Sequence, residues 1–339
     1  MPRVRHALAG LLVMLLLAAA LGLAACGSDA AGGAGTDGAA GGTTGDASGA
    51  ARPVIVTTTP MLGAIVRDAV GDGAEVRVVM PNGSDPHEWR PSAKDVAELQ
   101  SADLLVQNGL GLEQGLQEAV QQARDEGVPV FTATDHVDVR AGGDAAAHAG
   151  DEEHAGDDEH AGEGGESARD PHFWTDPAEV AKVVAALPPA VKSATGADVS
   201  ASTAAARKRL TALDAVIAKQ FAALPKSARN VVTGHESLGY LAARYGLMLT
   251  GAVTPSLSSQ GQVSAAHLKQ LEDAMAAAGV RVVFTETGLP NAVADAIVGQ
   301  TGATLVQVGT EAVPDDGSYA TYITELTRRI SSALANTGG

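Results

Sequence analysis

Apolar positions along residues 53–339 follow two alternating patterns. Short runs rich in Val, Ile and Leu are typical of buried strands, and longer stretches with apolar residues every three or four positions are typical of amphipathic helices. Strands that alternate with helices indicate an α/β fold built on parallel strands. The alternation runs through two series, which predicts two (βα)4-like domains. The predicted strands are 53–57, 75–80, 103–107 and 128–132 in the first series, and 230–233, 247–253, 280–285 and 304–308 in the second.

The longest helical pattern lies between the two series, at 198–224. Proline follows at position 225, where it ends the helix because it cannot continue the backbone hydrogen bonding. This pattern predicts one helix that joins an N-terminal domain at 53–197 to a C-terminal domain at 225–339. Its apolar residues recur at three- and four-residue steps: Leu210, Leu213, Ile217, Phe221 and Leu224.

The first residues have the layout of a secretory signal peptide. Arg3 and Arg5 precede an apolar run at 11–25, which is shorter than the roughly 20 residues that span a bilayer. The run ends in Leu-Ala-Ala before Cys26, a segment that resembles a bacterial lipobox, in which the cysteine is lipidated. We therefore predict a signal peptide over 1–25 and a lipid anchor at Cys26. The competing interpretation is an ordinary signal peptide in which Cys26 is incidental.

Two segments lack apolar periodicity. Residues 26–52 consist largely of Gly, Ala, Ser, Thr and Asp, and such a composition predicts a flexible tether. Residues 141–170 carry ten acidic residues against one Arg and repeat a His-Ala-Gly unit. High charge with little apolar surface predicts a disordered, solvated loop inside the N-terminal domain. The histidines of the repeat are His148, His154 and His160.

Charge and cysteine content exclude several classes of protein. A formal net charge of −17 argues against a nucleic-acid partner and does not favour an anionic membrane surface. The single cysteine excludes internal disulfides, so an exported fold must be stabilised by its core. Membrane attachment would then depend on Cys26, and we expect the protein to be a monomer.

Three of the nine histidines lie outside the acidic loop in settings that favour metal binding. His87 and His172 each follow Asp-Pro and precede an aromatic residue by one or two positions, and His235 directly follows a predicted strand. Open α/β sheets place their ligand sites at strand ends and helix starts. Imidazole suits Zn²⁺, and one carboxylate would complete a tetrahedron. A lone histidine is more often a hydrogen-bonded or exposed residue, but the repeated Asp-Pro-His setting favours a ligand.

Four segments follow one another along the chain: Asp85-Pro86-His87, Asn108-Gly109-Leu110-Gly111-Leu112-Glu113, the Asp170–Pro177 segment DPHFWTDP and the Gly234–Leu247 segment GHESLGYLAARYGL. In this order they resemble the metal-specific solute-binding proteins of bacterial ABC transporters, the zinc and manganese group, and the resemblance extends over residues 53–339. The resemblance implies that His87 and His172 bind the metal from the N-terminal domain and His235 from the C-terminal domain, in the cleft between them. It also implies that the helix at 198–224 is a rigid connector.

The fourth ligand follows less directly. Members of the group commonly carry a carboxylate after the last strand in a segment such as Asp-Pro-Leu-Glu, and here the best match is Glu311, without the Asp-Pro. Asp316, Glu236 or a water molecule are alternatives. Glu286, at the end of a predicted strand, could orient a ligand histidine or merely cap the next helix. Glu236 could also orient a ligand histidine from outside the set of ligands.

Three imidazoles and one carboxylate favour Zn²⁺ over Mn²⁺, because Mn²⁺ prefers oxygen-rich shells. The resemblance points the same way, since manganese members tend to carry a carboxylate in place of His235. The His-rich loop is typical of zinc members, and we predict that it captures zinc weakly, the alternative being incidental histidines. The predicted function is a zinc-binding protein that is held outside the cytoplasm and delivers zinc to an ABC-type permease.

Other functions are weaker hypotheses. They are a manganese-binding transport protein of the same family, a zinc-binding surface adhesin, and a metallohydrolase. An enzyme is not expected, because His235-Glu236 lacks the second histidine of a zincin helix and the chain lacks a Gly-x-Ser-x-Gly motif.

Overall fold

The computed structural model describes residues 52–142, 169–286 and 292–337. The predicted signal peptide, lipidated Cys26, the tether up to residue 51 and the histidines His148, His154 and His160 lie outside the described residues. None of the helices in the described part of the chain combines the length and the apolar content needed to cross a membrane.

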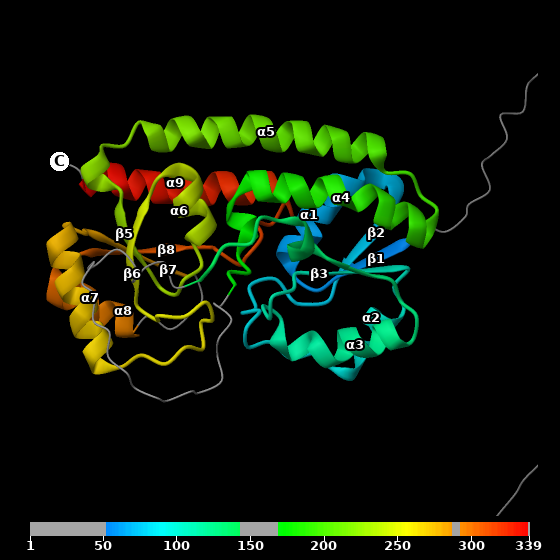
Figure 1. Cartoon of the computed structure of the whole chain (residues 1–339), viewed down its shortest axis with the longest axis horizontal. Helices are drawn as coiled ribbons and strands as arrows, with labels where there is room; N and C mark the ends of the chain where they lie inside the picture. Colours follow the sequence, from blue (N-terminus) through cyan, green and yellow to red (C-terminus); the bar gives the residue numbers. More distant parts are fainter. Residues whose placement is uncertain (1–51, 143–168, 287–291, 338–339) are drawn as a thin grey trace, which may run out of the picture. The chain divides into compact units, whose positions relative to one another are not determined.

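Two four-stranded parallel sheets form the centres of two lobes, which confirms the predicted α/β class with two domains. We call the parts around these sheets the N-lobe and the C-lobe (Figure 1). In the N-lobe the order is β2-β1-β3-β4, with β1 (Val54–Thr57), β2 (Glu75–Val78), β3 (Leu104–Gln107) and β4 (Val130–Thr132). In the C-lobe the order is β6-β5-β7-β8, with β5 (Asn230–Thr233), β6 (Met248–Ala252), β7 (Val282–Glu286) and β8 (Thr304–Val308).

The strand order places the ligand-binding edge of each sheet. The first strand of each lobe lies between the second and the third, so the direction of winding reverses beside it. Ligands of open α/β sheets bind beyond the carboxyl ends of the strands at such a reversal. The segment that follows β5 therefore lies where a site is expected, and the segment after β8 leaves the same carboxyl edge of the C-lobe sheet.

Helices cover both faces of the sheets. In Figure 1, α1, α4, α5 and α9 lie on one side, whereas α2 and α3 cover the other side of the N-lobe and α7 and α8 that of the C-lobe. The N-lobe helices are α1 (Pro60–Val70), α2 (Ala93–Gln100), α3 (Gln117–Asp125) and α4 (Pro177–Thr195). Helix α5 (Ser200–Ala222) precedes the C-lobe helices α6 (Gly239–Tyr245), α7 (Ala265–Ala278), α8 (Ala292–Thr301) and α9 (Tyr319–Thr337).

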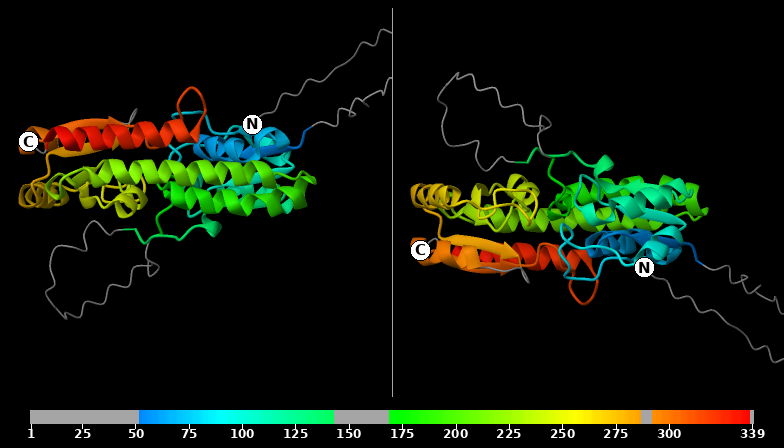
Figure 2. Two further views of the ribbon diagram at one scale, coloured as in Figure 1. Left: turned by 90° about the horizontal axis from the view of Figure 1, so that it is seen from above. Right: turned by 90° about the horizontal axis from the view of Figure 1, so that it is seen from below.

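Helix α5 runs along both lobes beside α4 and α9, as the views in Figure 2 also show. Its inward side chains, Leu210, Ile217 and Phe221, belong to one hydrophobic cluster that takes residues from both lobes. The ring of Phe221 stacks on Tyr245 of α6, with ring centroids 5.3 Å apart and planes at 12°. Apolar burial, which stabilises by about 25 cal/mol per Å², thus joins α5 to each lobe.

Replacing Phe221 by Ala tests this shared core. Phe221 is fully buried, so Phe221→Ala is expected to lower the free energy of unfolding by about 3–5 kcal/mol. Val216→Ala, at a 62% exposed position of the same helix, is the control and should change it by less than about 0.5 kcal/mol. Urea unfolding followed by circular dichroism measures both, and equal stabilities would contradict this role of Phe221.

Candidate metal centre

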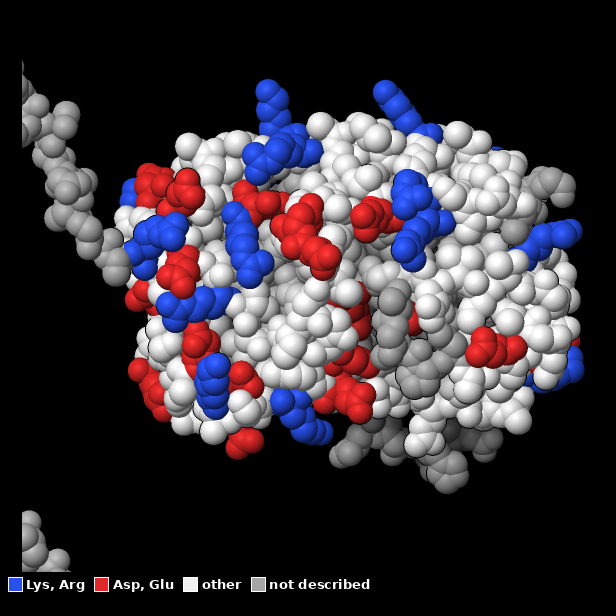
Figure 3. Space-filling model, turned by 180° about the vertical axis from the view of Figure 1, so that it is seen from behind, with Lys and Arg blue, Asp and Glu red and all other residues white. Residues whose placement is uncertain are grey.

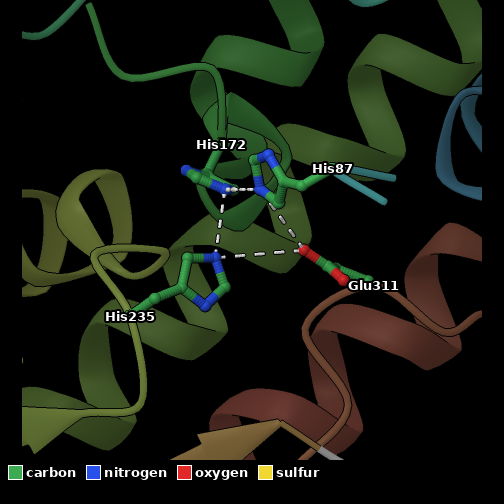
Figure 4. A group of neighbouring side chains, drawn as sticks. All are labelled: His87, His172, His235 and Glu311. Atoms are coloured by element: carbon green, nitrogen blue, oxygen red, sulfur yellow. Dashed lines mark hydrogen bonds and ion pairs between the residues drawn. The ribbon is translucent and has the colours of Figure 1, made fainter. Parts of the chain in front are cut away.

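Four side chains that are far apart in the sequence meet at the carboxyl ends of the strands. His87 lies in the loop after β2, and His172 directly precedes the 3-10 turn Phe173–Thr175 that leads into α4. His235 follows β5 by two residues, and Glu311 follows β8 by three. Figure 4 shows that all four point toward one another, and one ligand atom from each lies within 4.8 Å of the others.

The spacing of these atoms fits a tetrahedral metal ion. Nε2 of His172 is 3.4 Å from Nε2 of His87 and 3.4 Å from Nε2 of His235. Oε1 of Glu311 is 4.0 Å from Nε2 of His87 and 4.0 Å from Nε2 of His235. Metal bonds of about 2.0–2.1 Å give a tetrahedron with edges of about 3.3–3.4 Å. The two nitrogen–nitrogen distances already match that edge, and the two distances to the carboxylate oxygen are about 0.6–0.7 Å longer.

A carboxylate oxygen lies beside Nδ1 of two of the imidazoles. Nδ1 of His172 lies 2.8 Å from Oδ1 of Asp170, and Nδ1 of His235 lies 3.0 Å from Oε1 of Glu286. Ser237 donates a hydrogen bond of 3.0 Å to Glu286 and holds that carboxylate. A carboxylate at Nδ1 favours the tautomer with its proton there, which leaves the Nε2 lone pair free for a metal.

The contact of Asp170 with the His172 ring was missed by the sequence analysis, although the repeated Asp-Pro-His segment contained a signal. In both copies Oδ1 of the aspartate accepts the backbone N–H of the histidine two residues later, at 2.9 Å for Asp85 with His87 and 2.9 Å for Asp170 with His172. This local turn is favoured by Asp because its short side chain reaches the backbone two residues on. Only in the second copy does the same oxygen also reach the imidazole.

Burial disfavours positive charge on the N-lobe histidines. It lowers the pKa of His87 to about 2, with smaller contributions from neighbouring His172 and His235. Burial also lowers the pKa of His172, although Asp170 opposes it. Both imidazoles are therefore neutral, as a metal ligand must be.

In the C-lobe, the pKa values of His235 and Glu311 are both raised. Burial by itself lowers the pKa of His235, but the carboxylates of Glu286, Glu311 and Asp85 outweigh burial and raise it. Burial raises the pKa of Glu311 to about 8, because it disfavours the carboxylate; Asp85 and Glu286 raise it further and His235 opposes them. A divalent cation among these groups would stabilise the charged carboxylate that burial disfavours.

Glu311 also has an unsatisfied atom. Its side chain is 11% exposed, and Oε1 is buried without a hydrogen-bond partner in the described part of the chain. An unpartnered buried carboxylate oxygen costs free energy, so it indicates a missing partner such as a cation.

The other candidates for a fourth ligand lie elsewhere. Asp316 is exposed and accepts hydrogen bonds from Ser318 and Thr321. Neither Asp316 nor Glu236 belongs to the group of ligand atoms around the three histidines, which is the one such group in residues 52–142, 169–286 and 292–337. The geometry therefore favours Glu311.

A family model described as "Zinc-uptake complex component A periplasmic" (ZnuA) matches residues 55–333. The chain belongs to the ZnuA family. This confirms the resemblance to metal-binding proteins of ABC transporters, and the family consists of substrate-binding transport proteins rather than enzymes.

Individual relatives agree with this assignment. The chain is 33% identical over 306 residues to the high-affinity zinc uptake system protein ZnuA of Paracoccus denitrificans (strain Pd 1222), covering 84% of this chain and 91% of that protein. It is 26% identical over 286 residues to the manganese-binding lipoprotein MntA of Halalkalibacterium halodurans, covering 83% and 87%. The solved structure of the periplasmic zinc binding protein TroA from Treponema pallidum matches with a TM-score of 0.67 at 23% identity, covering 84% of this chain and 100% of that one. At that identity the structural match shows the fold alone.

Changing Asp170 tests whether orientation of the imidazole matters. Asp170→Asn keeps the size of the side chain but weakens the hold on Nδ1 of His172, so metal affinity is expected to fall about 10–100-fold. The matched control is Asp316→Asn, an exposed aspartate outside the cluster, which should leave affinity unchanged. Titration against a chromophoric chelator measures both, and equal affinities would show that Asp170 does not act on the site.

Proposed function

We propose that this protein binds Zn²⁺ with His87, His172, His235 and Glu311 and delivers it to an ABC-type permease for import. The observation that carries the proposal is the convergence of the four ligand atoms, with the nitrogen spacing of a tetrahedral site. Zinc is the cargo in this proposal and leaves the protein intact when it is released.

The donor set favours zinc over manganese. Three imidazole nitrogens and one carboxylate oxygen suit Zn²⁺, whereas Mn²⁺ prefers shells rich in oxygen. Because a relative is named as a manganese-binding lipoprotein, family membership alone does not decide the metal. The third nitrogen donor, His235, is the residue on which the choice rests.

A carrier fits the site better than a hydrolase does. A catalytic zinc keeps one position open for water or substrate. Here four protein side chains surround one point, and the side chains of His172 and His235 are 0% and 2% exposed. A shell that the protein itself fills supports binding and release rather than hydrolysis.

Delivery requires the protein to stay near its permease outside the cytoplasm. We propose that lipidated Cys26 anchors it to the membrane, that residues 26–52 are the tether, and that the His-rich loop supplies weakly bound zinc. Nucleic acid is not a partner in this proposal. The net charge of −17 supports that, and on the face in Figure 3 basic and acidic side chains are interspersed.

Metal titration of the stripped full-length chain in detergent tests the proposal. One tight Zn²⁺ site and much weaker Mn²⁺ binding are expected, and His235→Ala should lower zinc affinity by at least about 100-fold because it removes one of four ligands. His267→Ala is the control, since that C-lobe histidine lies outside the cluster. Equal or stronger Mn²⁺ binding would overturn the choice of metal, and the absence of a tight site would overturn the function.

Thermodynamic linkage gives a second test. Free zinc at about a thousand times the dissociation constant should raise the free energy of unfolding by about 4 kcal/mol, because the metal binds the folded state. At the same free zinc the effect should fall to about 1.4 kcal/mol or less in His235→Ala, because its affinity is expected to be at least about 100-fold weaker. A chain that unfolds when zinc is removed and does not rebind it would instead indicate a purely structural metal.

A further inference from the structure

Glu311 is the ligand with the least regular surroundings. It lies in the segment 309–313, which follows β8 and belongs to no helix or strand. A side chain on such a segment can occupy many positions, and ordering it on metal binding costs conformational entropy. The segment must therefore be held by contacts from elsewhere if Glu311 is to face the histidines before the metal arrives.

Asn82 makes such a contact two residues beyond Glu311. Its Nδ2 donates a hydrogen bond of 2.7 Å to the carbonyl oxygen of Val313, and its Oδ1 accepts one of 2.9 Å from the N–H of Val313. One amide side chain thus takes up both backbone polar groups of one residue, as a neighbouring strand would. Asn82 belongs to the N-lobe and lies five residues before His87, so the contact joins the lobes.

A second N-lobe side chain holds the residue before Glu311. The indole Nε1 of Trp174 donates a hydrogen bond of 2.8 Å to the carbonyl oxygen of Thr310, which also accepts one of 2.9 Å from the hydroxyl of Tyr322. Trp174 lies two residues after His172 and packs against its ring, with centroids 5.3 Å apart. Glu311 is therefore flanked by two attachments to the lobe that carries His87 and His172.

We propose that Asn82 is a positioning residue for the metal site: its paired hydrogen bonds to Val313 hold Glu311 in place as the fourth ligand. The inference rests on the proposed function and assigns no metal contact to Asn82 itself. Without the contact, the segment 309–313 would keep only its attachment at Thr310, and ordering the rest on metal binding would make zinc bind more weakly and dissociate faster. The three histidines would keep their positions.

Asn82 can be changed without opening the core. It is exposed, whereas Trp174 is 3% and Tyr322 2% exposed, so Asn82→Ala should fold normally. The matched control is Ser84→Ala in the same loop, because the Ser84 hydroxyl makes no hydrogen bond with the described residues.

The experiment is a double-mutant cycle on the full-length chain in detergent, with the unaltered chain, Asn82→Ala, Glu311→Ala and the double variant. Zinc affinity is measured by chelator competition, and the coordination number by the d–d absorption of bound Co²⁺, which is strongest in a four-coordinate site. Asn82→Ala should raise the zinc dissociation constant roughly three- to tenfold, the effect of one or two hydrogen bonds. In the Glu311→Ala background, Asn82→Ala should change the zinc dissociation constant by less than about twofold, because the carboxylate that Asn82 is proposed to position is absent.

The spectrum distinguishes positioning from general stability. Asn82→Ala should weaken the Co²⁺ absorption toward that of Glu311→Ala, and Ser84→Ala should match the unaltered chain. Equal losses of affinity from Asn82→Ala with and without Glu311, or an unchanged spectrum, would overturn the positioning role while leaving the proposed function intact. An unaltered chain without a tight zinc site would overturn both.

Discussion

The arrangement of this protein depends on burying three imidazoles and one carboxylate around a common point. Their ligand atoms face one another, and one oxygen of Glu311 has no partner among the described residues. Such a group is unfavourable by itself, since burial penalises the carboxylate and crowds nitrogen lone pairs. The surrounding fold holds it in place, and a divalent cation would turn the same contacts into attractive ones. The free-energy cost of the metal-free site and the affinity for the metal thus have the same origin, which is the burial of these four side chains around one point.

Supporting that arrangement requires two lobes that pack as one body. His87 and His172 come from the N-lobe, and His235 and Glu311 from the C-lobe, so their spacing depends on how the lobes meet. The hydrophobic cluster that includes α5 contains residues of both lobes, which makes separation of the lobes expose apolar surface. A site divided between the lobes can then keep a distance of 3.4 Å between Nε2 of His172 and Nε2 of His235, which come from different lobes.

Much of the fold could be predicted from the sequence because its signals are local. Buried strands such as Val231-Val232 give short β-branched runs, and their carboxyl ends locate His235 without any knowledge of packing. Contacts between distant segments leave no such signal. Asn82 and Val313 are 231 residues apart, and nothing near either one indicates the other. Glu311 and Asp316 lie in the same segment between β8 and α9, and tertiary packing decides which of the two side chains faces the histidines.

The four proposed ligands differ in what holds them in place. The histidines lie at strand ends and turns with carboxylate or backbone support, whereas Glu311 depends on contacts that cross between the lobes. These are one hydrogen bond from Trp174 and the pair made by Asn82, and each hydrogen bond contributes about 0.5–1.5 kcal/mol. Because these bonds join the segment 309–313 to the N-lobe, the position of Glu311 depends on how the two lobes meet. Of the four proposed ligands, Glu311 is therefore the one whose position depends most on contacts between the lobes.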